Sequence, residues 1–193
     1  MLRGLLVALL AVVAAPLHAQ APAANGVLLV AKPELPDPRF RDTVVLVTQT
    51  ADAQTVGVIL NRPTRMRLQE LWKDASPEGF AGPVFYGGPV LERTLVALFR
   101  SDAPPAHPAF HVLKNVYLSM HPGNLEPLLA RPDAPMRVFA GFSGWAPRQL
   151  EGELERDSWY VLPATEEILF RKDTASLWDE LLARAMRKRA ALY

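Results

Sequence analysis

Residues 137–161 read RVFAGFSGWAPRQLEGELERDSWYV, and the rest of the fold has to be arranged around this stretch. It opens with an apolar run, residues 137–140, which is typical of a β-strand. Glycines then bracket Phe142 and Ser143. Because glycine permits backbone angles and close approaches that a Cβ forbids, we expect a tight, packed turn over residues 141–144.

A short helix is expected after this turn. Pro147 suits the first position of a helix, because its missing N–H would be unpaired there in any case. Leu150 and Leu154 lie four residues apart and would share one face of the helix. Gly152 costs about 1 kcal/mol relative to alanine inside a helix, which suggests that another segment packs closely against it. A second apolar strand is predicted to begin at Trp159.

The same stretch resembles the signature of the YqgE/AlgH family, which is G-[YF]-[SA]-G-W-x-x-x-Q-L-E-x-E followed by a tryptophan. The matching residues are Gly141-Phe142-Ser143-Gly144-Trp145, Gln149-Leu150-Glu151, Glu153 and Trp159. Three more blocks resemble those of the family in the family's order. They are Leu29-Val30-Ala31 with Pro33, Leu35, Asp37-Pro38, Phe40 and Thr43-Val44-Val45; Gly57-Val58-Ile59-Leu60-Asn61-Arg62-Pro63; and Gly87-Gly88-Pro89-Val90. The resemblance implies a compact domain with a strongly curved, barrel-like sheet and peripheral helices, and it implies no particular activity.

The remaining pattern predicts more strands than helices. Two β-branched runs, residues 43–48 and 55–60, indicate a hairpin. Helices intervene irregularly rather than after every strand, which favours an α+β fold over a doubly wound parallel sheet. The last helix is predicted to be capped by Ser176, with Leu177, Leu181 and Met186 on its apolar side. We therefore expect a single compact α+β domain with a curved, partly barrel-like mixed sheet and peripheral helices.

The first residues have the order of a signal peptide. A short positive region with Arg3, an apolar run and a small-residue site at Ala19 follow one another, so we expect residues 1–19 to be removed. Residues 20–25 would then form a flexible leader and residues 26–193 the domain. This predicts a periplasmic or secreted protein without a membrane anchor after cleavage. The alternative is a misassigned start and a cytoplasmic protein.

Charge and composition exclude several classes of function. Without Arg3, the chain has 20 basic and 20 acidic side chains, and this balance argues against a nucleic-acid-binding or membrane-binding surface. With no cysteine, the chain can form neither disulfides nor a thiolate metal site. The spacing of His107 and His111 would suit a metal only on a helix, and the prolines around them predict a loop. We expect neither a metal nor another cofactor.

Two glycine-rich segments are candidates for chemistry. Gly87 and Gly88 could offer N–H groups to an anion, but Pro89 removes a donor and a strand follows, so a structural turn is favoured. Ser143 lies in G-F-S-G-W, which departs from the G-x-S-x-G of a nucleophile elbow. A buried serine that satisfies a turn is favoured over a nucleophile, and we expect Trp145 and Trp159 to be core anchors.

The family blocks also supply the candidate binding residues. They are Asn61, Arg62, Gly87, Gly88, Gly141, Ser143, Gly144, Trp145, Gln149 and Glu151. The leading prediction is a non-enzymatic binding or regulatory protein that acts after export on a protein or small-molecule partner. One alternative is a transcriptional regulator of the AlgH type, if the chain is cytoplasmic. The other is a hydrolase that uses Ser143 or the carboxylates of Glu151 and Glu153.

Overall fold

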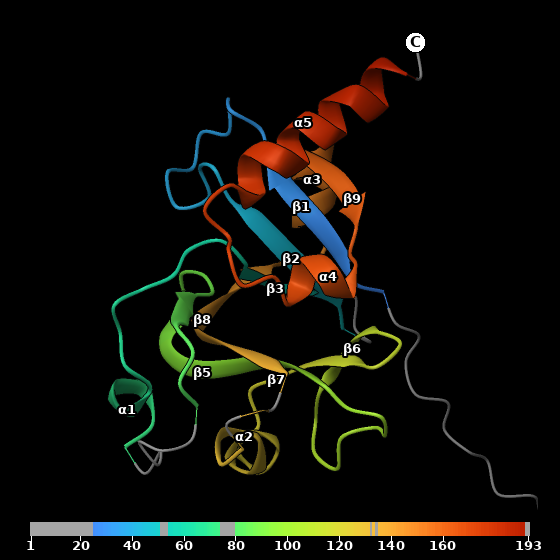
Figure 1. Cartoon of the computed structure of the whole chain (residues 1–193). Helices are drawn as coiled ribbons and strands as arrows, with labels where there is room; N and C mark the ends of the chain where they lie inside the picture. Colours follow the sequence, from blue (N-terminus) through green and yellow to red (C-terminus); the bar gives the residue numbers. More distant parts are fainter. Residues whose placement is uncertain (1–24, 51–53, 74–79, 132, 134, 192–193) are drawn as a thin grey trace, which may run out of the picture.

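The computed structural model describes residues 25–50, 54–73, 80–131, 133 and 135–191 (Figure 1). The strands in these residues are β1 (Val27–Ala31), β2 (Val44–Gln49), β3 (Thr55–Ile59), β4 (Val84–Tyr86), β5 (Val90–Arg100), β6 (Phe110–Leu113), β7 (Val116–Ser119), β8 (Met136–Trp145) and β9 (Trp159–Pro163). The helices are α1 (Leu68–Leu71), α2 (Pro122–Leu129), α3 (Gln149–Glu155), α4 (Glu166–Leu169) and α5 (Leu177–Ala190).

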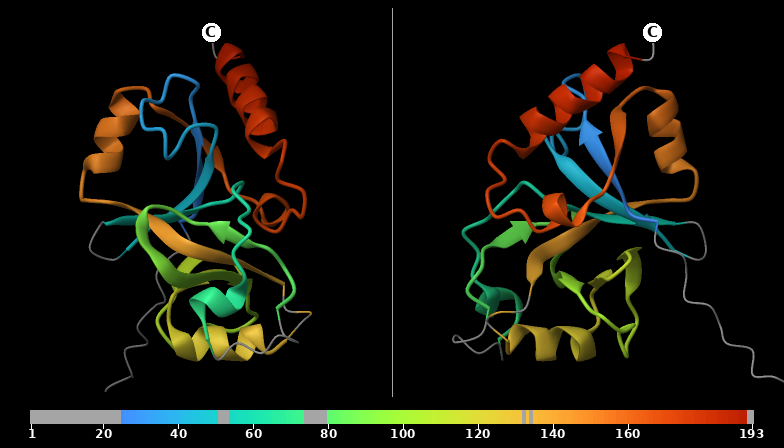
Figure 2. Two further views of the ribbon diagram at one scale, coloured as in Figure 1. Left: turned by 90° about the vertical axis from the view of Figure 1, so that its left-hand side faces the viewer. Right: turned by 45° about the vertical axis from the view of Figure 1, so that its right-hand side comes forward.

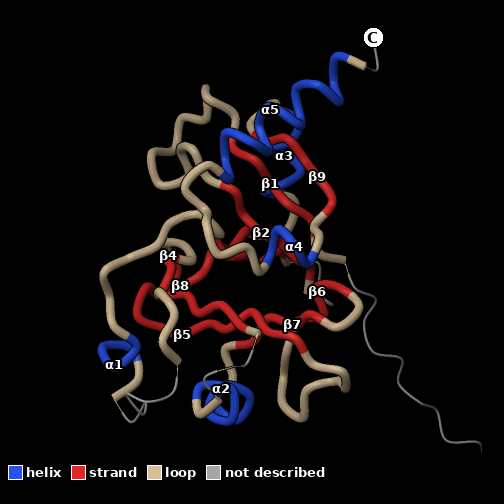
Figure 3. Tube along the Cα trace, in the orientation of Figure 1, coloured by secondary structure: helices blue, strands red, loops and turns tan. Residues whose placement is uncertain are grey.

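All of these strands belong to one sheet, in the order β6-β7-β5-β8-β3-β2-β1-β9, with β4 paired to β8 beside this path. The paired strands are antiparallel except β4 and β8, which run parallel. The sheet curls until the N–H of Gly26 donates to the carbonyl oxygen of Val112 in β6, at 2.9 Å. It stays open, with β6 and β9 as its ends, and helices lie at its periphery (Figure 3). The expected α+β fold with a curved mixed sheet is confirmed.

Alternation along β1 directs its side chains to two separate cores, as the twofold period of a strand requires. Leu28 and Val30 pack in the cluster that contains residues of α5, whereas Leu29 and Ala31 pack with both tryptophans of the signature. Figure 2 shows α5 and α3 on opposite sides of the strands β1, β2 and β9. The indole Nε1 of Trp178 in α5 donates to the carbonyl oxygen of Ala31, at 2.8 Å, which fixes α5 to the sheet.

Strand β8 corrects the expectation of a glycine turn over residues 141–144. The chain continues as one strand to Trp145, and it pairs with β3, β4 and β5. Gly141 has a φ of +69°, and a Cβ there would lie 2.6 Å from the carbonyl oxygen of Gly88. The glycines therefore permit the connection between β4 and β5 to approach the strand closely, rather than reversing the chain.

Helix α3 starts later than expected, because Pro147 lies outside it and Arg148 precedes it with a left-handed φ of +67°. Leu150 is buried and Leu154 packs against the same core, which confirms their shared face. The expectation of close packing at Gly152 is wrong. A Cβ at position 152 would meet only the flexible guanidinium of Arg156, at 3.4 Å. No neighbouring segment therefore requires a glycine at this position.

Helix α5 differs from its expected pattern at two positions. Ser176 occupies the position before the helix, but its hydroxyl donates to the carboxylate of Glu180 instead of accepting from a backbone N–H. Met186 is 55% exposed, and Ala185 is buried in its place. The buried face of the helix repeats every four residues and consists of Leu177, Leu181 and Ala185. Met186 is one position further along and therefore faces solvent.

The hairpin of β2 and β3 is confirmed, with Val45 opposite Ile59 and Val47 opposite Gly57. The predicted signal peptide lies in residues 1–24, outside the described residues. Within the described ranges, no helix has both the length and the apolar character needed to cross a membrane.

Candidate functional site

The signature residues meet at the carboxylate of Glu153 in α3. Its Oε2 accepts hydrogen bonds from the indole Nε1 of Trp145, at 3.0 Å, and of Trp159, at 2.9 Å. Its Oε1 accepts from Nε2 of Gln149, at 3.1 Å. Gln149 in turn accepts from the N–H of Ala146, at 3.1 Å. We call Glu153 with these three partners the Glu153 junction; it ties the end of β8, the helix α3 and the start of β9 together.

The rings of the junction form an aromatic cluster with Phe40. Phe40 lies 5.9 Å from Trp145 and 5.8 Å from Trp159 between ring centroids, and the two tryptophans meet edge to face at 6.4 Å. Such arrangements add about 0.5–1.5 kcal/mol per pair beyond area burial. Both tryptophans are 4% exposed, which confirms that they are core anchors.

A cleft of about 310 Å³ opens beside this cluster, and we call it the tryptophan cleft. It brings together residues that are far apart in sequence: Leu35, Pro36, Asp37, Arg39, Phe40, Pro89, Val90, Gly144, Trp145, Gln149, Glu153, Arg156, Ser158 and Trp159. Figure 2 shows α3 next to the loop that follows β1, and both contribute to the lining. Three of the four family blocks therefore converge on one hollow.

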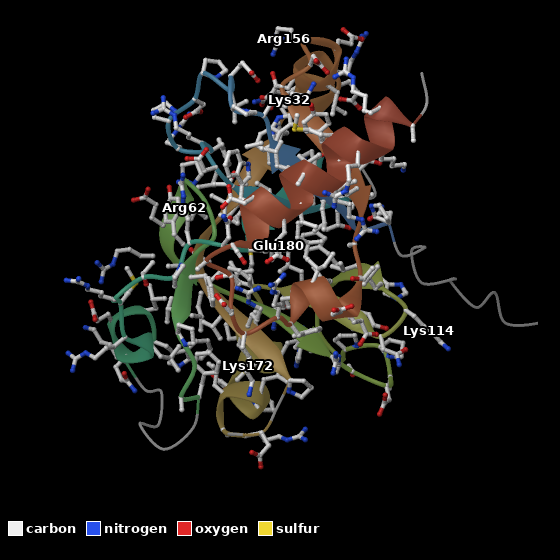
Figure 4. The ribbon with its side chains drawn as sticks, turned by 45° about the horizontal axis from the view of Figure 1, so that its top comes forward. Lys32, Arg62, Lys114, Arg156, Lys172 and Glu180 are labelled. Carbon is white, nitrogen blue, oxygen red and sulfur yellow. The ribbon has the colours of Figure 1, made fainter. Side chains whose placement is uncertain are left out.

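The charged groups of the cleft are of both signs. Asp37 and Arg39 form a bidentate pair with oxygen–nitrogen distances of 2.7–3.2 Å, and the hydrogen bonds from Arg39 lower the pKa of the Asp37 carboxyl. Arg156, labelled in Figure 4, is exposed and forms no ion pair within the described residues. The cleft thus combines aromatic walls with a cation that is available to a ligand.

Asn61 and Arg62 do not line the cleft, and instead fasten the loop that does. Oδ1 of Asn61 accepts from the N–H of Val44, at 2.9 Å, and its Nδ2 donates to the carbonyl oxygen of Asp42, at 2.8 Å. Arg62 donates to the carbonyl oxygens of Arg39 and Arg41. These contacts of Asn61 and of Arg62, which is labelled in Figure 4, hold the loop that lines the cleft.

Ser143, Gly87 and Gly88 are packed together in the interior. The hydroxyl of Ser143 is fully buried and donates to the carbonyl oxygen of Gly87, at 3.0 Å. A Cβ on Gly87 would lie 2.1 Å from the carbonyl oxygen of Gly141, and Gly88 has a φ of +148°. The glycines are thus needed for the close approach of the β4–β5 connection to β8.

Some of the remaining candidate residues line the tryptophan cleft, and others do not. Of the ten, Gly144, Trp145 and Gln149 line the cleft, while the exposed Glu151 does not. Sequence reasoning missed Asp37, Phe40 and Arg156 as lining residues. It also named Glu153 only as a catalytic alternative. Its spacing of four residues after Gln149 could have indicated a side-chain pair on one helical face.

The histidine pair is split in the structure. His107, in the loop before β6, stacks on His121, with ring centroids 4.5 Å apart. His111 lies in β6 and stacks on Tyr117, at 4.9 Å. The expected loop is therefore wrong for His111, which lies in a strand, and the H-x-x-x-H spacing does not lie on a helix. In the described part of the chain, no group of three or more metal-ligating side chains gathers.

Comparisons with known proteins agree on one family. A family model described as AlgH-like matches residues 28–189. A UPF0301 protein of Thermobifida fusca is 36% identical over 171 residues, which cover 83% of this chain and 86% of the relative. A UPF0301 protein of Myxococcus xanthus is 34% identical over 159 residues, covering 80% and 87%.

The fold also has solved counterparts. The solution structure of the AlgH protein from Pseudomonas aeruginosa superposes with a TM-score of 0.67 at 24% identity, covering 87% of this chain and 92% of that one. A crystal structure of a protein from Corynebacterium diphtheriae gives 0.64 at 23% identity, covering 87% and 90%. With the family model spanning residues 28–189 and relatives at 34–36% identity, this protein belongs to the AlgH-like family.

Proposed function

We propose that this protein is a non-enzymatic binding protein that acts after export and holds its ligand in the tryptophan cleft. The observation that carries the proposal is the convergence of three family blocks on this hollow. The cleft has a volume of about 310 Å³. This is at the lower end of the range for small-molecule binding sites, whose volumes are roughly 300–1,000 Å³. The ligand is a small molecule, or a single side chain of a partner, with an apolar body and a polar group.

The side chains of the site favour binding over catalysis. The carboxylate of Glu153 already accepts three hydrogen bonds from neighbouring side chains, so it acts as a structural acceptor. A general base must reach the proton that it removes, and these donors occupy its oxygens. The buried hydroxyl of Ser143 donates to a backbone carbonyl, and within the described residues no basic side chain forms a hydrogen bond with it. The hydrolase alternative is thus less well supported.

Blocking the cleft tests the proposal. A Cβ at Gly144 would lie 3.7 Å from Val90, another lining residue, and 3.6 Å from Phe142, so a side chain fits there. Gly144→Leu should reduce the cleft, and Gly144→Ala is the matched control that leaves most of it open. Ser158→Phe, at another lining residue, is a second blocking variant.

Small molecules that co-purify with each mature variant from periplasm are compared by mass spectrometry. We expect one species with the wild type and Gly144→Ala, and its loss with both blocking variants at unchanged melting temperature. Retention of the same species by both blocked variants would show that it binds elsewhere and would overturn the cleft as the site.

A further inference from the structure

A second hollow, of about 630 Å³, lies between segments that come together from four parts of the chain. Its lining comprises residues 80–83, Phe85, Arg100, residues 135–137 and residues 170–172. It shares no lining residue with the tryptophan cleft. We call it the basic groove, because the charged residues that line it are all cations within the described part of the chain.

Two of its four cations have carboxylate partners. Arg100 pairs with Glu166, at 2.8 Å, and Arg171 pairs with Glu180, at 2.6 Å. Within the described residues the other two cations form no ion pair. They are Arg137 and Lys172.

Arg137 is an unusual residue to find in this position, since its side chain is buried with 6% exposure. Its Nη2 donates to the carbonyl oxygen of Leu60, at 2.5 Å, and its Nη1 donates to that of Leu169, at 3.2 Å. The guanidinium lies 4.0 Å from the ring centroid of Phe85. These two bonds occupy two of the five N–H donors of a guanidinium, and Arg137 lines the groove.

Burial lowers the pKa of Arg137 to about 10, so the side chain remains a cation at neutral pH. Among the residues that the structure describes, neutral carbonyls and an aromatic face solvate this charge and no carboxylate neutralises it. A buried charge without a counter-ion is costly. An anion in the groove would supply the missing counter-charge. Arginine suits this role because its planar donors match the geometry of carboxylates and phosphates.

We propose that the basic groove binds an amphiphilic organic anion, whose carboxylate or phosphate group meets Arg137 and Lys172. Its apolar body lies against Phe85 and Phe170, two aromatic residues of the lining. Lys172, labelled in Figure 4, is exposed and lines the groove, where it adds a second, flexible positive charge. The inference does not depend on the function proposed for the tryptophan cleft.

Two dyes with the same aromatic body separate charge from hydrophobicity. 8-Anilinonaphthalene-1-sulfonate is an anion, and N-phenyl-1-naphthylamine is its uncharged counterpart. Fluorescence titrations of the mature protein should show saturable binding of the anion that is at least about tenfold tighter than that of the neutral dye, and that weakens with salt. Equal affinity for the two dyes, or no saturable binding of the anion, would overturn the proposal.

Variants then locate the site. Lys172→Glu should weaken binding of the anionic dye about tenfold or more, since it places a like charge beside the ligand. The control is Lys114→Glu, an exposed lysine that lies away from Lys172 (Figure 4) and should change little. Gly144→Leu, in the other cleft, should also change little. An unchanged affinity for Lys172→Glu, or equal losses for both lysine variants, would contradict the assignment.

Competition identifies the anionic group. Dodecanoate and dodecyl phosphate displace the dye in separate titrations, and the tighter competitor shows whether the site prefers a carboxylate or a phosphate. Displacement by dodecanol as effective as by either anion would contradict an anion site. If its melting curve shows that Arg137→Met is folded, this variant should have lost the preference for the anionic dye. If Arg137→Met does not fold, the affinity of Lys172→Glu for the anionic dye tests the proposal.

Discussion

Trp145 and Trp159 point their indole N–H groups at one atom, Oε2 of Glu153, at 3.0 and 2.9 Å. Trp145 ends β8 and Trp159 begins β9, and the helix between them carries the shared acceptor. Two donors on one carboxylate oxygen fix both rings and the helix at once. The spacing of the family signature is thereby explained, because the helix must return the chain with Glu153 directed at both rings.

Glu153→Ala should destabilise the protein. It leaves two partly buried indole N–H groups without an acceptor, and each such loss costs about 1–3 kcal/mol. Glu153→Gln keeps one oxygen and should be intermediate. Urea unfolding followed by tryptophan fluorescence measures the change, with the exposed Glu155→Gln as the control. A loss for Glu153→Ala no larger than that for the control would show that the junction does not stabilise the fold.

Ser143→Ala should lower stability by about 0.5–1.5 kcal/mol, because the buried carbonyl oxygen of Gly87 loses one of its two donors and keeps the N–H of Ile59, at 3.0 Å. Ser158→Ala is the control, since its hydroxyl makes no hydrogen bond within the described residues. Both variants and the wild type are also screened for ester and peptide hydrolysis. Hydrolysis by the wild type that Ser143→Ala abolishes at unchanged stability would favour the hydrolase alternative.

The pair of Glu180 and Arg171 predicts a pH dependence. Hydrogen bonds, first from Arg171 and then from Ser176, lower the pKa of Glu180 from 4.5 to about 2. A depressed folded-state pKa stabilises the protein above the unfolded-state value, and this contribution is lost as the pH falls from about 4.5 to about 2. Glu180→Gln should therefore lower the urea midpoint at pH 7, with the difference vanishing near pH 2.

The exposed Glu126→Gln on α2 is the control for this pH series. Its midpoint should follow that of the wild type throughout. A difference between Glu180→Gln and wild type that stays constant from pH 7 to pH 2 would contradict the account of this ion pair.

Export is tested by the intact mass of the protein from periplasmic extract. The ordered regions of residues 1–19 predict a chain that starts at Gln20. A full-length chain that retains Met1 and is found only in the cytosol would instead favour a cytoplasmic regulator. The proposed cleft can be tested on either form.

Local pattern was sufficient to predict part of this fold. The hairpin of β2 and β3 follows from β-branched runs, and the buried face of α3 follows from Leu150 and Leu154. Strand β8 was misread at its glycines, because its partners come from distant segments. Val90 lies opposite Phe142 and Gly57 opposite Ser143, and these pairings replace the turn that glycine favours locally.

The site was only partly predictable for the same reason. Of Glu151, Glu153 and Glu155, only Glu153 follows Gln149 by four residues, and this spacing indicates a side-chain pair. It does not indicate the two indoles that converge on Glu153. Arg137 is the second residue of β8, and the residues next to it in sequence give no sign that it will be buried. Its burial depends on carbonyl oxygens of Leu60 and Leu169, which are distant in sequence.

The most direct test of the tryptophan cleft is the set of indole N–H resonances of ¹⁵N-labelled protein. The chain has four tryptophans, and two of them, Trp145 and Trp159, line the cleft, whereas Trp72 and Trp178 do not. Adding the small-molecule fraction released from periplasmic protein should shift the resonances of Trp145 and Trp159 and leave the other two in place. Unchanged resonances for Trp145 and Trp159, or shifts confined to Trp72 and Trp178, would contradict binding in the cleft.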